Sequence, residues 1–171
     1  MAAGDRTFID TNILLYAHDA SAAAKQPVAR AVLDRLWAER AGTLSTQVLQ
    51  EFYYVATRKL SPPVSRTEAR QVIDTYSAWP TVILDPALIL AATRLEEEEQ
   101  LSFWDALIVE AARLSGATRL LTEDMQHGRV LGGVQIVNPF APEPQAESGA
   151  AAAGDAGRGS GPRARCAPED A

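Results

Sequence analysis

Thr7-Phe8-Ile9-Asp10-Thr11-Asn12 is the stretch that decides the fold, because a short apolar segment runs directly into a carboxylate, a hydroxyl and an amide. The aromatic and β-branched residues before Asp10 favour a strand, and residues 13–17 have the composition of a helix. We therefore expect Asp10 where a strand ends and a helix begins, which is where open α/β sheets place their ligand sites. The simpler interpretation is that Asp10, Thr11 or Asn12 only caps the helix.

Length and composition indicate one globular domain. A chain of 171 residues is long enough to bury a core, and 47% hydrophobic with 22% charged residues is ordinary for such a domain. The single cysteine, Cys166, has no partner in the chain, which fits a reducing compartment. The N-terminal residues 1–6 contain no apolar signal segment, and no apolar run approaches the roughly 20 residues of a membrane helix. We expect a soluble, cytoplasmic protein with no membrane partner.

Strand and helix patterns alternate along the chain. Ser65-Arg66-Thr67-Glu68 has the pattern of a capping box, Asp85-Pro86 is typical of a helix start, and Gly42 is expected to end the second helix. This alternation predicts a single α/β domain, with a parallel twisted sheet flanked by helices in an α/β/α sandwich. The expected strands are 7–9, 43–45, 81–84, 118–121 and 134–137, and the expected helices are 13–16, 27–41, 46–59, 66–79, 86–99 and 103–115.

The patterned domain covers residues 1–140. Residues 141–171 are Ala, Gly, Pro, Glu and Arg with almost no large apolar residues, so we interpret them as a disordered tail. The formal net charge of −6 argues only weakly against a nucleic-acid partner, because an enzyme that binds RNA through metal ions keeps acidic residues in its site.

Two helix carboxylates fall at positions where a carboxylate is costly. Glu51 flanks the apolar stripe of the expected helix 46–59, although a solvated glutamate is the simpler interpretation. Asp105 lies on an apolar face of the expected helix 103–115, where burying an unpaired ion costs on the order of several kcal/mol. The alternative for Asp105 is stabilisation by the helix dipole, which is worth about 1 kcal/mol or less at an exposed helix end.

Asp124 follows an expected strand, as Asp10 does. In a parallel sheet both lie at carboxyl ends of strands, and the helices that carry Glu51 and Asp105 begin at the same edge. Converging carboxylates raise one another's pKa, so the arrangement makes chemical sense with a hard divalent cation. Oxygen ligands indicate Mg²⁺ or Mn²⁺, and a sequence without a cysteine or histidine cluster argues against zinc. Glu123 is expected to point away from Asp124.

Four short motifs occur in order along the chain, and together they form a specific signal. They are Phe8-Ile9-Asp10-Thr11-Asn12, Val48-Leu49-Gln50-Glu51-Phe52, Trp104-Asp105-Ala106-Leu107-Ile108 and Leu121-Thr122-Glu123-Asp124-Met125-Gln126-His127-Gly128. On these motifs the chain resembles the PIN-domain ribonucleases, and most closely the VapC-like toxins of toxin–antitoxin pairs. The resemblance covers residues 7–140.

The resemblance implies a metal-dependent endoribonuclease. The acidic site that it implies, with Mg²⁺ or Mn²⁺ as cofactor, consists of Asp10, Glu51, Asp105 and Asp124. By the same match, Thr11 and Asn12 orient the first carboxylate or a bound water, and Thr122 supports the last. The implied reaction is in-line hydrolysis of an RNA phosphodiester, leaving 5′-phosphate and 3′-hydroxyl ends. The implied partners are RNA, a second copy of the chain in a homodimer, and a cognate antitoxin with a basic side chain reaching the carboxylates. His127 is left out of the site.

Two other classes of protein stay open. A Mg²⁺-dependent phosphatase-like hydrolase also uses strand-end aspartates, but a haloacid-dehalogenase-like enzyme needs an Asp-x-Asp pair, whereas Asp10 is followed by Thr11 and Asn12. A catalytically inactive binding module would use the acidic groove for a basic peptide. Such a module can lose a carboxylate without penalty, and the chain retains all of them, which favours the enzyme.

Overall fold

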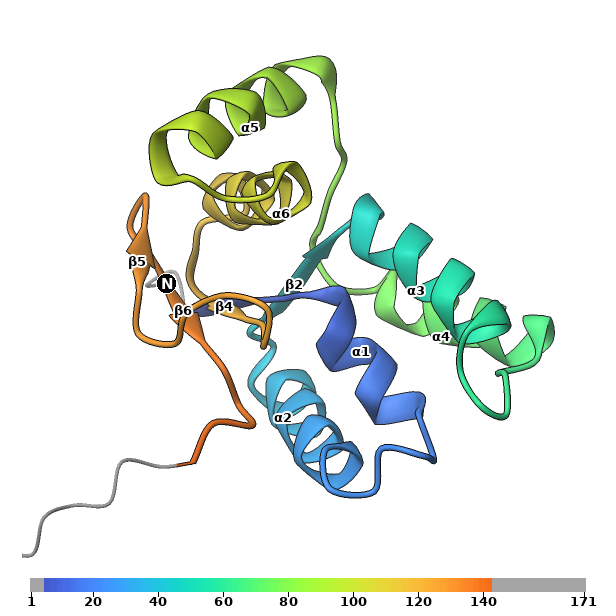
Figure 1. Cartoon of the computed structure of the whole chain (residues 1–171). Helices are drawn as coiled ribbons and strands as arrows, with labels where there is room; N and C mark the ends of the chain where they lie inside the picture. Colours follow the sequence, from blue (N-terminus) through green and yellow to red (C-terminus); the bar gives the residue numbers. More distant parts are fainter. Residues whose placement is uncertain (1–4, 143–171) are drawn as a thin grey trace, which may run out of the picture.

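The chain folds around a six-stranded sheet with the strand order β3-β2-β1-β4-β6-β5, seen in the computed structural model that describes residues 5–142 (Figure 1). The strands are β1 (Arg6–Ile9), β2 (Gly42–Ser45), β3 (Thr81–Val82), β4 (Ala117–Leu121), β5 (Val130–Leu131) and β6 (Val134–Val137). All neighbours pair in parallel except β5, which runs antiparallel to β6. The tail from residue 143 onward lies outside the described residues.

Helices cover both faces of this sheet. Helices α5 and α6 lie on one side, α1 and α2 on the other, and α3 and α4 form a pair beside α1 (Figure 1). The helices are α1 (Thr11–His18), α2 (Gln26–Glu39), α3 (Thr46–Arg58), α4 (Arg66–Tyr76), α5 (Pro86–Glu99) and α6 (Phe103–Leu114). The predicted single α/β/α domain is confirmed. Within the described residues, no helix has the length and apolar character that crossing a bilayer requires.

The core lies between the central strands and the helices packed on them. Phe8, Leu120 and Ile136 of the three central parallel strands are completely buried. Helices α1 and α3 add Ile13 and Phe52, which are also fully buried. Each such side chain contributes roughly 1.5–3 kcal/mol of hydrophobic stabilisation, so the strand that leads to Asp10 is held rigidly.

The sequence predicts that Gly42 ends α2, and this prediction is wrong. The helix ends at Glu39, and Arg40 takes the left-handed conformation with φ 53°. Gly42 is instead the first residue of β2, and the Trp79 ring packs so closely that a Cβ there would lie 2.5 Å from ring atoms. Two smaller differences concern strands, since β3 is shorter than expected and β5 was not foreseen.

The strand register brings the acidic residues to one edge. Ile9 of β1 lies opposite Leu121 of β4, and Asp10 N donates a hydrogen bond of 2.9 Å to Leu121 O. Asp10 and Thr122 are therefore neighbours at the carboxyl ends of adjacent strands. Helix α6 ends at Leu114, close to where β4 begins at Ala117, so the C-terminal end of α6 lies near the amino end of β4.

Candidate active site

Asp10 occupies the corner between β1 and α1. It is the N-cap of α1, and its Oδ1 accepts a hydrogen bond of 2.6 Å from Thr11 N. Its other oxygen, Oδ2, accepts one of 2.7 Å from the Thr122 hydroxyl. The side chain is 6% exposed. The cap interpretation raised by the sequence is thus correct as far as it goes, but an ordinary cap faces solvent, and this one is buried among other acidic side chains.

Asn12 joins Asp10 to Asp124. Its Nδ2 lies 2.9 Å from Asp124 Oδ2, 3.2 Å from Asp10 Oδ2 and 3.1 Å from the Thr122 hydroxyl oxygen. Thr122 also accepts a hydrogen bond of 3.1 Å from Asp124 N. The amide thus lies among the oxygens of two carboxylates and reduces the repulsion between them.

Glu51 is held at both of its carboxylate oxygens. The Thr11 hydroxyl donates to Oε2 at 2.8 Å, and Gln47 Nε2 donates to Oε1 at 2.9 Å. Glu51 is half-buried on α3, as its place beside the apolar stripe predicted. Because Thr11 directly follows Asp10, this contact ties α3 to the strand-end corner.

The protonation of Asp10 reflects this setting. Its pKa is raised from 3.8 to about 7, chiefly by burial and to a lesser extent by the nearby negative charges of Asp124 and Glu51. The Thr122 hydroxyl and the Thr11 N–H act in the opposite direction, because both donate hydrogen bonds to the carboxylate. A carboxyl poised near neutral pH among other carboxylates is typical of a functional site.

Asp105 is the predicted site residue that stands apart from these contacts. It lies in the first turn of α6, and its Oδ2 accepts a hydrogen bond of 2.8 Å from Ser102, the N-cap of that helix. Among the described residues, no hydrogen bond joins Asp105 to Asp10, Glu51 or Asp124. Its side chain is only partly buried, so the full desolvation cost inferred from the sequence does not apply. Nor is α6 buried all round, because Trp104 is 62% exposed and Leu114 is 66% exposed.

The donor atoms suit a hard divalent cation, but their present arrangement does not enclose one. Asp10, Glu51 and Asp124 offer oxygen only, and Asn12 Oδ1 is buried without a hydrogen-bond partner. Over residues 5–142, no three His, Cys, Asp or Glu side chains lie close enough together to hold one ion. The Asn12 Nδ2 group instead bonds carboxylate oxygens of Asp10 and Asp124.

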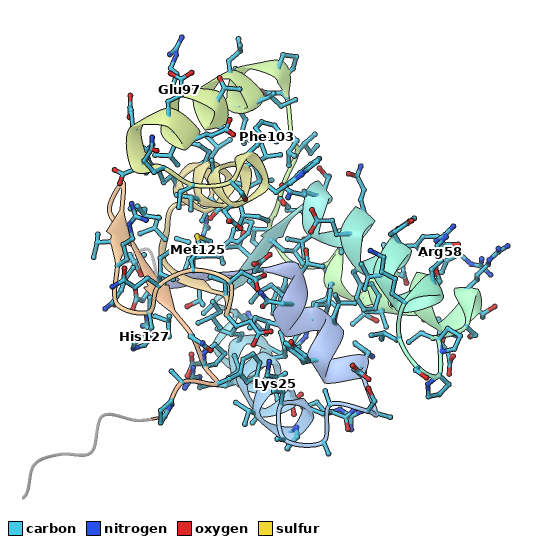
Figure 2. All side chains as sticks on the ribbon, viewed as in Figure 1. Lys25, Arg58, Glu97, Phe103, Met125 and His127 are labelled. Atoms are coloured by element: carbon cyan, nitrogen blue, oxygen red, sulfur yellow. The ribbon has the colours of Figure 1, made fainter. Side chains whose placement is uncertain are left out.

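Glu123 and His127 have other contacts. Glu123 accepts a hydrogen bond from the Tyr16 hydroxyl, and its Oε2 lies 2.5 Å from Lys25 Nζ. The Glu123 side chain therefore binds α1 and the start of α2, while Asp124 faces Asn12. His127 is exposed (Figure 2), and its Nδ1 accepts a hydrogen bond of 3.0 Å from Asn138 N.

Sequence reasoning missed Gln47. The side chain is 3% exposed, and its Oε1 has no hydrogen-bond partner in the described structure. The available signal was its spacing, because residues four apart on a helix lie on the same side, and Gln47 precedes Glu51 by four. Its burial follows from the packing of α3 and leaves no trace in the local sequence.

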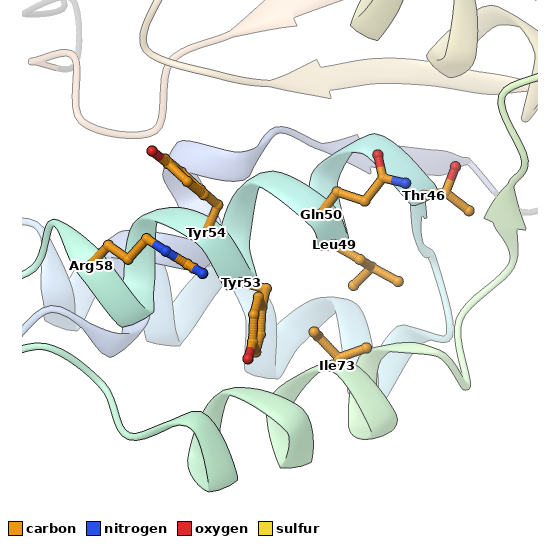
Figure 3. A pocket seen from close by; sticks show the side chains of 7 residues that line it. All are labelled: Thr46, Leu49, Gln50, Tyr53, Tyr54, Arg58 and Ile73. Atoms are coloured by element: carbon orange, nitrogen blue, oxygen red, sulfur yellow. The ribbon is translucent and has the colours of Figure 1, made fainter.

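An apolar groove lies between α3 and α4. It has a volume of about 550 Å³ and is lined mainly by α3 side chains, with Ile73 from α4 opposite them (Figure 3). The guanidinium of Arg58 lies 4.9 Å from the centre of the Tyr54 ring at one end of this groove. The lining residues are Thr46, Leu49, Gln50, Tyr53, Tyr54, Arg58 and Ile73.

A family model described as the PIN domain matches residues 7–131. The chain therefore belongs to the PIN domain family. The matched residues include all of the predicted site residues. They also include parallel strands described above, with acidic residues at the strand ends. The comparison with curated proteins gives no match.

Solved structures show the same fold at low sequence identity. A toxin-antitoxin complex from Klebsiella pneumoniae aligns with a TM-score of 0.57 and 18% identity over 78% of this chain and 97% of that chain. VapC20 of Mycobacterium tuberculosis, described as a Sarcin-Ricin loop cleaving toxin, aligns with a TM-score of 0.52 and 22% identity over 67% of this chain and 86% of that chain. FitAB bound to an IR36 DNA fragment aligns with a TM-score of 0.61 and 15% identity over 81% of this chain and 99% of that chain. These similarities support the fold.

Proposed function

We propose that this protein is a divalent-metal-dependent endoribonuclease and the toxin of a VapBC-like toxin–antitoxin pair. The observation that carries the proposal is the buried Asp10 carboxyl, with a pKa of about 7, beside Asp124 and Glu51. Membership of the PIN domain family supports a nuclease, and the similar folds of VapC20 and of the Klebsiella complex support a toxin. We propose that it acts on cytoplasmic RNA.

In this proposal, Asp10, Glu51, Asp105 and Asp124 would hold Mg²⁺ or Mn²⁺, which would supply charge stabilisation at the scissile phosphate and an activated water. The chain's own groups set the geometry. Thr122 and the Thr11 N–H fix the Asp10 carboxylate, and deprotonation of Asp10 near neutral pH makes both of its oxygens available.

Asn12 and Thr11 position the other two carboxylates of this network, those of Asp124 and Glu51. The Asn12 amide holds Asp124 toward Asp10, and the Thr11 hydroxyl holds Glu51. The Asn12 amide occupies carboxylate oxygens that a bound cation would need, so the amide would be free for another acceptor if a cation took those oxygens. Asp105 is partly exposed and Asp124 is exposed, which leaves the site open to a polymer.

The test is cleavage of total cellular RNA by the purified protein with Mg²⁺, Mn²⁺ or EDTA. Asp10→Asn and Asp105→Asn are expected to abolish cleavage, as is EDTA. Asp85→Asn is the matched control, because Asp85 also caps a helix, α5, but lies outside the acidic site. Cleavage that survives EDTA or both site variants contradicts the proposal. Binding of a basic peptide without any cleavage would favour the inactive binding module.

The partner proposal has a separate test. We propose that the cognate antitoxin covers the acidic site, with a basic side chain that reaches the carboxylates. Co-expression with the neighbouring reading frame is expected to give a complex that lacks RNA cleavage. A protein that purifies alone and fully active from this co-expression contradicts the antitoxin. Light scattering of the purified chain tests the homodimer, for which a monomer mass is the contrary result.

A further inference from the structure

The loop that carries Asp124 needs support from outside the sheet. It follows β4, and residues 122–129 belong to no helix or strand. Asp124 itself is exposed, and within the described structure its carboxylate has one hydrogen bond, from Asn12 Nδ2 at 2.9 Å. A carboxylate placed in this way keeps a defined position only if its neighbours in the loop are fixed.

Glu123 provides such a fixed point. Its Oε1 accepts from the Tyr16 hydroxyl, its Oε2 lies 2.5 Å from Lys25 Nζ, and Lys25 Nζ also donates to Tyr16 Oη at 3.0 Å. The three polar groups therefore form a closed triangle. Lys25 Nζ also lies 4.3 Å from the centre of the Tyr16 ring and 5.4 Å from that of Phe140, so the ammonium contacts two aromatic rings.

The triangle joins four segments of the chain. Tyr16 belongs to α1, Lys25 (Figure 2) precedes α2, Glu123 lies in the loop after β4, and Phe140 follows β6. The Tyr16 and Phe140 rings meet edge to face, with centroids 5.2 Å apart. Tyr16 and Lys25 thus hold Glu123, and Phe140 packs against both of them. Glu123 is adjacent in sequence to Asp124.

Asp124 consequently lies between two anchored residues. On one side, Glu123 is held in the triangle, and its side chain is 19% exposed. On the other, Met125 is buried in the core with 8% exposure. With both neighbours fixed, the direction of the Asp124 side chain toward Asn12 is set by the backbone.

We propose that Glu123, Lys25 and Tyr16 form a clamp that positions Asp124 for cation binding in the acidic site. This inference rests on the proposed function, since it concerns the geometry of that same site. The three are positioning residues that act through Asp124. The clamp assigns a role to Glu123, which is adjacent to the acidic site but directed away from it.

The variant Lys25→Met separates a positioning role of Lys25 from an effect of its charge alone, because the two predict opposite changes in cation affinity. Lys25 neutralises Glu123, so Lys25→Met leaves an extra negative charge close to the site and would strengthen cation binding by simple attraction. If Lys25 acts through position, the same variant weakens binding because the loop loses its anchor. Lys25→Met therefore separates the two explanations.

The experiment measures Mg²⁺ and Mn²⁺ affinity of the full chain by calorimetry, together with hydrogen exchange of the Asp124 amide. We expect Lys25→Met and Glu123→Ala each to weaken binding by about tenfold, the lower end of the range for residues that orient metal ligands. The double variant should be no weaker than either single variant. Lys25→Arg should restore affinity, and exchange of Asp124 N–H, which donates to Thr122, should accelerate in the weakened variants only.

Arg119→Met is the matched control, because it breaks the ion pair of Arg119 with Asp5, an exposed pair that involves the same strand, β4. It should leave both readouts unchanged. Tyr16→Phe, which removes only a hydroxyl, replaces Lys25→Met if that variant does not fold. Unchanged or tighter binding in the clamp variants, or unchanged exchange at Asp124, overturns the clamp. A wild-type chain that binds neither cation refutes the proposed function instead, and the exchange data still decide the clamp.

Discussion

Asn12 and Asp124, which are 112 residues apart in the sequence, are joined by a side-chain hydrogen bond of 2.9 Å across the carboxyl edge of the sheet. The same amide nitrogen lies 3.2 Å from Asp10. One neutral donor thus holds two like charges together. The amide bonds the same carboxylate oxygens that a cation would need, so Asn12 and a cation are alternative partners of these two carboxylates.

Asn12→Ala should destabilise the metal-free protein. Without the amide, Asp10 and Asp124 face each other with fewer donors, and leaving a charged group without its hydrogen bond costs about 1–3 kcal/mol. Urea unfolding in EDTA near pH 8 measures this loss. Saturating Mg²⁺ should recover most of it, because the cation then neutralises both carboxylates. If Asn12→Ala lowers the free energy of unfolding by the same amount with and without Mg²⁺, a cation does not replace the Asn12 amide as the partner of these carboxylates.

The stability of the metal-free protein should fall as the pH rises through neutrality. The pKa of Asp10 is raised by burial from 3.8 to about 7, so the folded state binds this proton more tightly than the unfolded chain. The contribution is fully present below about pH 4 and is lost as the pH rises through the folded pKa; a shift of this size corresponds to roughly 4 kcal/mol.

Urea unfolding in EDTA at several pH values between about 5 and 8 measures that dependence. Asp10→Asn removes the titrating group, so its curve should be much flatter than that of the wild type. Asp85→Asn, which changes an exposed cap of α5, should follow the wild type. Parallel curves for wild type and Asp10→Asn would show that another group is responsible.

Local sequence predicted the features whose causes are local. The capping box of Ser65 with Glu68 and the Asp85 cap are confirmed, because each depends on residues within a single turn. The corner at Asp10 was likewise visible, since an apolar strand ends there in a capping residue. The parallel sheet then followed from the alternation of elements, and with it the proximity of Asp10 and Asp124.

Contacts between distant segments could not be predicted in this way. Lys25 and Glu123 are 98 residues apart, and neither has a local pattern that indicates a partner. The sequence predicts Gly42 as a helix stop because glycine often ends helices, but the role of Gly42 depends on Trp79, which packs on it from another segment. Asp105 is identified from a family motif, and its side-chain hydrogen bond in the described structure is with Ser102. Its approach to the other carboxylates therefore stays a prediction.

Gln47→Leu should separate stability from activity. Gln47 is 3% exposed with an unpartnered Oε1, so leucine removes a buried polar atom that lacks a hydrogen bond. This gain offsets part of the loss of the hydrogen bond from Gln47 Nε2 to Glu51, and unfolding free energy should change by less than about 1 kcal/mol. Glu51, however, loses the donor at Oε1, and RNA cleavage should fall by roughly tenfold. Gln50→Leu, on an exposed position of the same helix, should retain activity. Equal cleavage by both variants would remove the positioning role of Gln47.

Gly42→Ala should destabilise the fold without altering the acidic site. A Cβ at Gly42 would lie 2.5 Å from atoms of the Trp79 ring, and that ring packs against Trp37 and Tyr76 with centroids 4.9 and 5.1 Å away. Relief requires the aromatic cluster to move, which costs about 1–3 kcal/mol in a packed core. Thermal unfolding measures the loss, and Trp79→Phe should reduce it in the double variant. The control is Gly116→Ala, where φ is +74° and no atom lies within 4 Å of the added Cβ, so only backbone strain of about 1–2 kcal/mol is expected. If Trp79→Phe gives no relief, the cost at Gly42 does not come from the ring.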